Sequence, residues 1–328
     1  MSRHLGLALL TLALCTPAAF AETLDQTLER AAQAANQGRA DEALALLEAR
    51  LARAGSEDDL VRLRGMLGDL YLLTNDPGPA LAHYDWIAAQ RPDHARAHYK
   101  RGQALERASR MEEAIQAYQR AGDLGHEASD ALARIGFCYK VLAEREGTPA
   151  AERERYLLLA AQRLSRAIQL DTRNGSALGN MADLAFNSGN YPSALKLYLH
   201  MDRIQPSKPT TLARLGSTYA SLGRHAQAIE TLRRAAQLAE AGQPVDFADR
   251  WVYRDAAVFS RIRIAQSLIA LGRRAEARGE LQRVLELADC GDCRTTTRET
   301  ERSRERAQAL LEELGAGPVP AAPQRAAP

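Results

Sequence analysis

The chain repeats itself with a period of 34 residues, and this repeat limits the possible folds more than any other feature of the sequence. Gly68, Ala80 and Tyr84 recur 34 positions later as Gly102, Ala114 and Tyr118. A fixed period of this length is typical of proteins in which short units stack on one another, because no single unit can bury its own apolar face. Alanine and leucine are abundant and only 5% of the residues are aromatic, which predicts that the units are helical.

The repeated residues resemble the tetratricopeptide repeat, a hairpin of two antiparallel helices. That repeat has a small residue and then a large one in its first helix, an alanine and then an aromatic in its second helix, and often a terminal proline. The second copy in this chain carries Gly68, Tyr71, Ala80, Tyr84 and Pro92 at these places. The resemblance implies an all-α fold, a right-handed superhelical solenoid of about seven such hairpins followed by a C-terminal capping helix.

The sequence predicts one solenoid over residues 22–314. Its repeats are expected at residues 24–57, 61–94, 95–128, 129–174, 175–208, 209–242 and 258–291. The fourth repeat contains twelve inserted residues with a break at Gly147-Thr148-Pro149, so both of its helices are expected to be lengthened. A second insertion precedes the seventh repeat, whose first helix is expected to begin early, near Asp246.

The chain is expected to end in a capping helix and a tail. The helix is predicted over residues 296–314, with Thr296 and Glu299 as a capping box. Its inward stripe is expected to consist of Ala307, Leu310, Leu311 and Leu314. Residues 315–328 are rich in alanine and proline and are predicted to be disordered.

The first 21 residues have the features of a secretory signal peptide. A short basic start precedes an apolar run and then Ala19-Phe20-Ala21, so cleavage is expected after Ala21. The mature chain is then expected in the periplasm, with no integral membrane segment because no later apolar run is long enough. The alternatives are an uncleaved anchor and lipid attachment at Cys15, which is disfavoured because the bulky Leu14 precedes it.

The charge pattern argues against nucleic acid as a partner. The 43 basic and 41 acidic side chains give a net charge of +2, and the two signs are interspersed with no run of five like charges. A phosphate-binding surface needs a concentrated basic stripe, which the sequence lacks.

No recognisable catalytic motif is present in the sequence. It contains no nucleophile elbow, Walker loop, zinc-protease motif or dinucleotide glycine pattern, so we expect neither an enzyme nor a cofactor or metal. Cys290 and Cys293 are expected to form a disulfide in an oxidising compartment, with a redox role as the alternative. Cys138 is expected to be a buried thiol.

The resemblance also implies where a partner would bind, because the first helices of successive repeats line the concave surface of such arrays. The residues expected there are Arg96, Tyr99, Gln103, Phe137, Lys140, Asn180, Asp183, Phe186, Asn187 and Arg214. Each aromatic could instead fill a gap between helices. Trp251 and Tyr253, in the second insertion, form a separate candidate patch.

These observations predict a non-catalytic protein-interaction scaffold of the bacterial cell envelope. Its groove would bind a protein or an extended peptide, because amides can grip a backbone while side chains rest on aromatic rings. The alternative is a carbohydrate-binding accessory protein in exopolysaccharide export.

Overall fold

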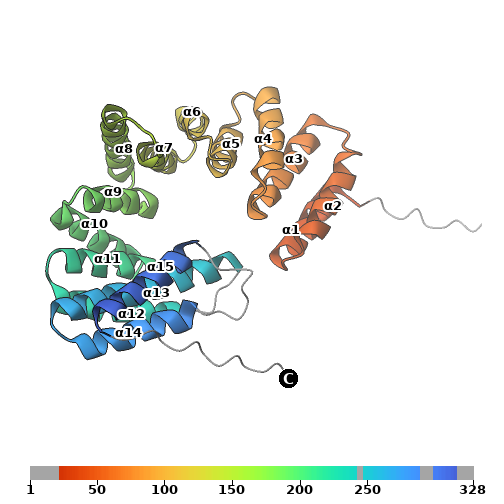
Figure 1. Cartoon of the computed structure of the whole chain (residues 1–328). Coiled ribbons are helices and arrows are strands. Elements are labelled where there is room, and N and C mark those ends of the chain that lie inside the picture. The colour runs from red at the N-terminus through yellow and green to blue at the C-terminus, as the bar shows by residue number, and fades with distance from the viewer. Residues whose placement is uncertain (1–21, 242–246, 289–297, 316–328) are drawn as a thin grey trace, which may run out of the picture. The chain divides into compact units, whose positions relative to one another are not determined.

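The computed structural model describes residues 22–241, 247–288 and 298–315, and in these stretches the chain forms fifteen α-helices and no strand (Figure 1). The expected all-α fold is confirmed. The signal peptide, Cys290, Cys293 and the tail 316–328 lie outside the described residues, as do the side chains of Trp251, Tyr253, Thr296 and Glu299. The predicted handedness of the solenoid stays a prediction.

The chain divides into two compact units, Met1–His126 and Glu127–Pro328. The first contains α1 (Leu24–Asn36), α2 (Ala40–Leu51), α3 (Glu57–Leu73), α4 (Pro77–Gln90), α5 (Ala95–Arg107) and α6 (Met111–Asp123). The second contains α7 (Ala128–Glu144), α8 (Ala150–Leu170), α9 (Gly175–Asn187), α10 (Tyr191–Ile204), α11 (Pro209–Ser221), α12 (His225–Ala241), α13 (Phe247–Ala270), α14 (Arg274–Ala288) and α15 (Arg298–Glu313).

Each odd-numbered helix from α1 to α13 packs against the even-numbered helix that follows it. In the hairpins that begin with α3, α5, α7 and α11, the close approach depends on a glycine in the first helix. A Cβ atom on Gly68 would lie 2.6 Å from the ring of Tyr84, and one on Gly216 would lie 2.5 Å from Cγ of Leu232. Both facing side chains are buried, so they fill the space that the glycine leaves.

Side-chain caps define where several helices begin. Thr23 and Gln26 form a capping box at the start of α1, and Ser56 accepts a hydrogen bond from the backbone of Asp59 at the start of α3. Asn174 caps α9 and also donates hydrogen bonds to Ser129 and Asp130, at 2.8 and 2.6 Å. This one buried amide therefore both begins a helix and ties the fourth hairpin to the fifth.

Both insertions extend helices, as the sequence predicts. Helices α7 and α8 have 17 and 21 residues, whereas α5 and α6 have 13 each. Helix α13 begins at Phe247 and is 24 residues long. In each case the added residues continue a hairpin and do not form a separate element.

Helix α15 packs against α13 and α14 through the apolar stripe expected from the sequence. Ala307, Leu310, Leu311 and Leu314 are all buried. The described part of the helix spans Arg298–Glu313, and the expected start at residue 296 lies outside the described residues. Cys138, in α7, is fully buried as predicted.

Among the described residues, no helix has the length and apolar character needed to cross a membrane.

Candidate functional site

The residues expected to bind a partner fall on the first helices of the hairpins. Arg96, Tyr99 and Gln103 lie on α5, in the first unit. The other seven lie on α7, α9 and α11, in the second unit. The second unit therefore holds the larger part of the candidate groove.

Four of these side chains form a polar ladder in the second unit, which links α7, α9 and α11. Lys140 Nζ on α7 donates to Asn180 Oδ1 at 2.9 Å and lies 3.5 Å from Asp183 Oδ2, both on α9. Arg214 Nε on α11 lies 3.8 Å from Asp183 Oδ1. We call Lys140, Asn180, Asp183 and Arg214 the groove ladder. It connects three successive hairpins through side chains alone.

Asp183 is the central acceptor of the groove ladder. The hydroxyl of Tyr198, on α10, donates to Asp183 Oδ1 at 2.5 Å, so one carboxylate serves a tyrosine and two cations. Burial, and then the negative charge of Asp183, raise the pKa of Tyr198 well above its ordinary value, and the phenol keeps its proton. Lys140 is buried and depends on these acceptors, whereas Arg214 is 53% exposed and can reach a partner.

The first unit contains the same arrangement. Tyr84 donates to Asp69 Oδ1 at 2.8 Å, and Lys100 Nζ lies 2.9 Å from the same oxygen, while Arg96 donates to Asp69 Oδ2 at 2.8 Å. In both units the tyrosine follows the aspartate by 15 residues. We call this arrangement of an aspartate, a tyrosine and a cation of the next hairpin the junction triad.

The aromatic residues expected in the groove serve packing to different degrees. Tyr99 is only 7% exposed and packs edge-on against Tyr118, with ring centroids 5.4 Å apart, which favours the packing alternative for this residue. Phe186 is half-buried and meets Tyr191 edge-on at 5.2 Å. Phe137 is also half-buried, and Lys140 Nζ lies 5.5 Å from its ring centroid. Phe137 and Phe186 therefore remain partly accessible beside the groove ladder.

A pocket of about 430 Å³ lies on the candidate binding face of the first unit. Gly65 opens it, because no side chain there covers Val61 and Ile87. Arg62 and Arg96 line its edge and are exposed or half-exposed. The pocket thus combines an apolar floor with an edge at which Arg62 is paired with Asp25 and Arg96 with Asp69.

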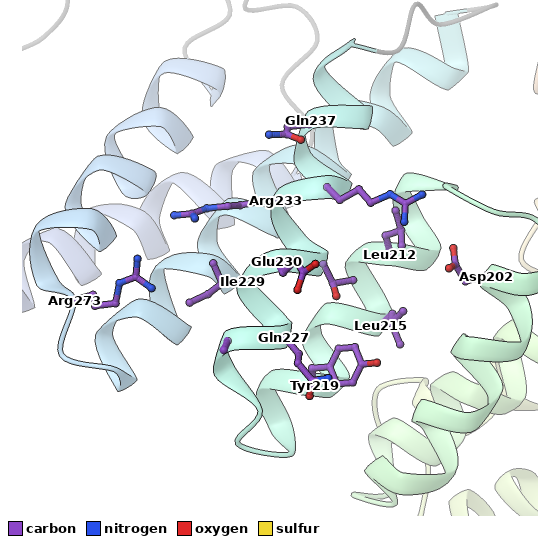
Figure 2. A pocket seen from close by; sticks show the side chains of 13 residues that line it. Asp202, Leu212, Leu215, Tyr219, Gln227, Ile229, Glu230, Arg233, Gln237 and Arg273 are labelled. Atoms are coloured by element: carbon purple, nitrogen blue, oxygen red, sulfur yellow. The ribbon is translucent and has the colours of Figure 1, made fainter.

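Two further pockets lie in the second unit and contain little of the predicted site. One, of about 680 Å³, is lined by residues of α7 to α10 and includes Asn187. The other, of about 760 Å³, lies beside α11 and α12, as Figure 2 shows. Its Arg233 and Arg273 are both paired with Glu276, and its Arg234 donates to the hydroxyl of Ser207.

Sequence reasoning missed the roles of Lys100, Tyr84 and Tyr198 in these contacts, since it gave Tyr84 only as a residue of the repeat. The spacing of Asp69, Tyr84 and Lys100 along the sequence recurs in Asp183, Tyr198 and Arg214, and this repeated spacing could have indicated the contacts. Within the described part of the chain, no group of three or more histidine, cysteine, aspartate or glutamate residues could hold a metal ion.

The fold and the polar faces of its first helices define an α-helical repeat protein. Family models of the tetratricopeptide repeat match residues 66–125 and 209–241. The chain is a tetratricopeptide-repeat protein. No curated protein matches the sequence significantly.

Several solved structures share this fold. A tetratricopeptide repeat protein from Parabacteroides merdae is 13% identical with a TM-score of 0.59, and the match covers 87% of this chain and 98% of that one. The structure of the APC/C hetero-tetramer Cut9-Hcn1 is 17% identical with a TM-score of 0.59 over 87% of this chain and 49% of that one. The structure of pilF from Pseudomonas aeruginosa is 17% identical with a TM-score of 0.52 over 67% and 93%. At such identities the likeness establishes the fold alone.

Proposed function

We propose that this chain is a non-catalytic scaffold of the bacterial cell envelope that binds an extended segment of a partner protein along α7, α9 and α11. The tetratricopeptide fold in general supports protein–protein interaction. The observation that carries the proposal for this chain is the groove ladder, in which side chains from three hairpins form one continuous polar track.

The groove ladder has the chemistry that recognition of an extended segment requires. The amide of Asn180 accepts from Lys140 and donates to the backbone oxygen of Ser176, which leaves one N–H and one lone pair for a peptide backbone, and Arg214 is exposed enough to pair with a partner. Phe137 and Phe186 flank this track and could contact apolar side chains of the segment. Lys140 and Asp183 are held by the protein itself, so they order the groove before the partner arrives.

The experiment is a quantitative affinity purification from periplasmic extract. The bait is the mature chain, compared with a double variant carrying Arg214→Ala and Phe137→Ala. We expect specific proteins with the native chain and at least about tenfold less of them with the double variant, a loss of roughly 1.4 kcal/mol. Arg233→Ala, on α12, is the matched control because it removes an arginine of comparable exposure outside the groove.

The outcomes separate the proposal from its alternatives. Equal recovery by the native chain and the double variant would place the interface elsewhere on the molecule. Recovery of no protein, together with binding to an oligosaccharide array, would replace the proposed protein partner by a carbohydrate.

Export to the periplasm is a second part of the proposal, supported by residues 1–21 of the sequence. When the full-length chain is produced in a bacterium, we expect it in the periplasmic fraction with Glu22 as its first residue. Mass spectrometry of the recovered chain measures this directly. A cytoplasmic chain that keeps residues 1–21 would contradict export and leave the groove unaffected.

A further inference from the structure

The junction triad allows a comparison of the junctions between successive hairpins inside each unit. Two junctions carry it in full, with Asp69, Tyr84 and Lys100 in one and Asp183, Tyr198 and Arg214 in the other. Two others lack all three members of the triad. The equivalent positions are occupied by Ala32, Leu47 and Met66 in one junction and by Phe137, Leu164 and Asn180 in the other. In these four junctions the cation is present only together with its aspartate.

The junction between α11 and α13 breaks this rule. Ser217 follows Gly216 as Asp69 follows Gly68, and Leu232 packs on Gly216 as Tyr84 packs on Gly68. The places of the aspartate and the tyrosine are therefore taken by Ser217 and Leu232. The cation is nevertheless present, because Arg263 Nε donates to Ser217 Oγ at 3.2 Å.

Arg263 contacts only neutral groups among the described residues. Besides Ser217 Oγ, it approaches the backbone oxygen of Ser217 at 3.5 Å and donates to Gln266 Oε1 at 3.1 Å. No described carboxylate lies within 4.0 Å of it. The side chain is half-buried, and this desolvation lowers the pKa of Arg263 below its ordinary value.

Arg261 makes the contrast clear, because it belongs to the same helix and is similarly withdrawn from solvent. It pairs with Glu240 at 2.7 Å and with Glu280 at 2.6 Å, so two carboxylates offset the cost of burying its charge. Arg263 has no such compensation in the described protein. A partly buried guanidinium without a counter-ion is costly unless a ligand supplies one.

The surroundings of Arg263 belong to the face on which the groove ladder lies. Ser217 is on α11, three residues after Arg214. Tyr191 is near enough to Arg263 for its charge to act to raise the pKa of Arg263. The ring of Tyr191 packs against Phe186. Ser217 is only 2% exposed and its hydroxyl accepts from Arg263, so it positions the guanidinium, while a ligand group at Arg263 would meet the cation and the aromatic pair.

We propose that Arg263 and Ser217 form an anion subsite that binds an aspartate or glutamate side chain of the partner segment, in the place of the missing junction aspartate. The inference rests on the proposed function and names the chemistry of its partner. Charge complementarity supports it, because Lys140 and Arg214 share one carboxylate, Asp183, and the contacts of Arg263 among the described residues are to the neutral groups of Ser217 and Gln266. A guanidinium can bind a carboxylate through two parallel hydrogen bonds, which makes an acidic side chain the fitting occupant.

The test uses a phage-displayed library of random dodecapeptides, selected on the mature full chain. We expect selected peptides to share an acidic residue whose replacement by glutamine weakens binding about 30-fold, the lower range for removal of one partner of a buried charge pair. Arg263→Gln is expected to weaken the binding of the acidic peptides to the same extent and to leave the binding of their glutamine versions unchanged. Arg233→Gln, on α12, is the matched control and is expected to bind like the native chain.

Ser217→Asp is the second variant, and it keeps Arg263 in place. It restores the internal carboxylate that the other triads have, so it is expected to raise the Tm of the second unit while weakening the acidic peptides about 30-fold. This combination distinguishes loss of the subsite from loss of the fold.

Three results would overturn the inference. Selected peptides without an acidic preference would remove the anion subsite and leave peptide binding in place. Equal affinity of the native chain and Ser217→Asp for acidic peptides would show that Arg263 is not part of the binding surface. Selection of no peptide would overturn both this inference and the proposed groove.

Discussion

Replacing Asp183 by alanine is expected to lower the free energy of unfolding of the second unit by about 3 kcal/mol. The reason is that Asp183 accepts from Tyr198 and neutralises Lys140, and both side chains are buried. Removal of the carboxylate leaves a buried ammonium group with Asn180 as its remaining hydrogen-bond partner. Urea unfolding followed by circular dichroism measures the loss.

Two variants serve as controls for Asp183→Ala. Asp183→Asn keeps an acceptor for Tyr198 and is expected to cost less than the alanine variant. Asp69→Ala removes the equivalent carboxylate of the first unit, where Arg96 and Lys100 are 62% and 26% exposed and return to water more readily than Lys140, so a loss of about 1 kcal/mol is expected. Similar losses for Asp69→Ala and Asp183→Ala would contradict the idea that burial of Lys140 sets the difference.

Gly216→Val is expected to destabilise the second unit by about 3 kcal/mol, at the upper end of the range for an overpacked core. Any Cβ at this position meets Leu232 Cγ at 2.5 Å and the backbone oxygen of Ala228 at 3.3 Å. Because the backbone cannot move aside as a flexible side chain can, α11 and α12 must separate. The midpoint of urea unfolding reports the change.

Gly279→Ala is the matched control for the effect of a side chain on a helical glycine. Gly279 lies within α14, and a Cβ there would meet no atom within 4 Å. The substitution is expected to stabilise the protein by about 1 kcal/mol, the usual gain in helix propensity. Effects of the same sign at Gly216 and Gly279 would refute the packing explanation.

The second insertion illustrates how local sequence predicts an element. Helix-forming residues run without a break from the insertion into the seventh repeat, and α13 begins at Phe247 accordingly. The stripe of Ala307, Leu310, Leu311 and Leu314 likewise predicts the buried face of α15, because residues spaced by three and four positions share one side of a helix.

The candidate site could be predicted only as a set of helix faces. The repeat positions place Lys140, Asn180, Asp183 and Arg214 on first helices, but they do not tell which of these side chains meet. Tyr99 and Asn187 are both predicted to line the groove, and yet Tyr99 is buried against Tyr118 and Asn187 lines the pocket between α7 and α10. The length and direction of neighbouring side chains decide such contacts, and these depend on how the hairpins pack.

The sequence by itself determined the hairpin repeat, since the small residues and the large ones that face them recur at a fixed period and each pairing is local. The tertiary structure decided which charges are compensated. Asp69 and Asp183 contact cations of the following hairpin. Arg263 contacts Ser217, although the two residues are 46 positions apart and an insertion lies between them. Contacts between hairpins depend on the stacking of whole helices. For this reason the lack of a described counter-ion at Arg263 can be recognised only in the folded chain.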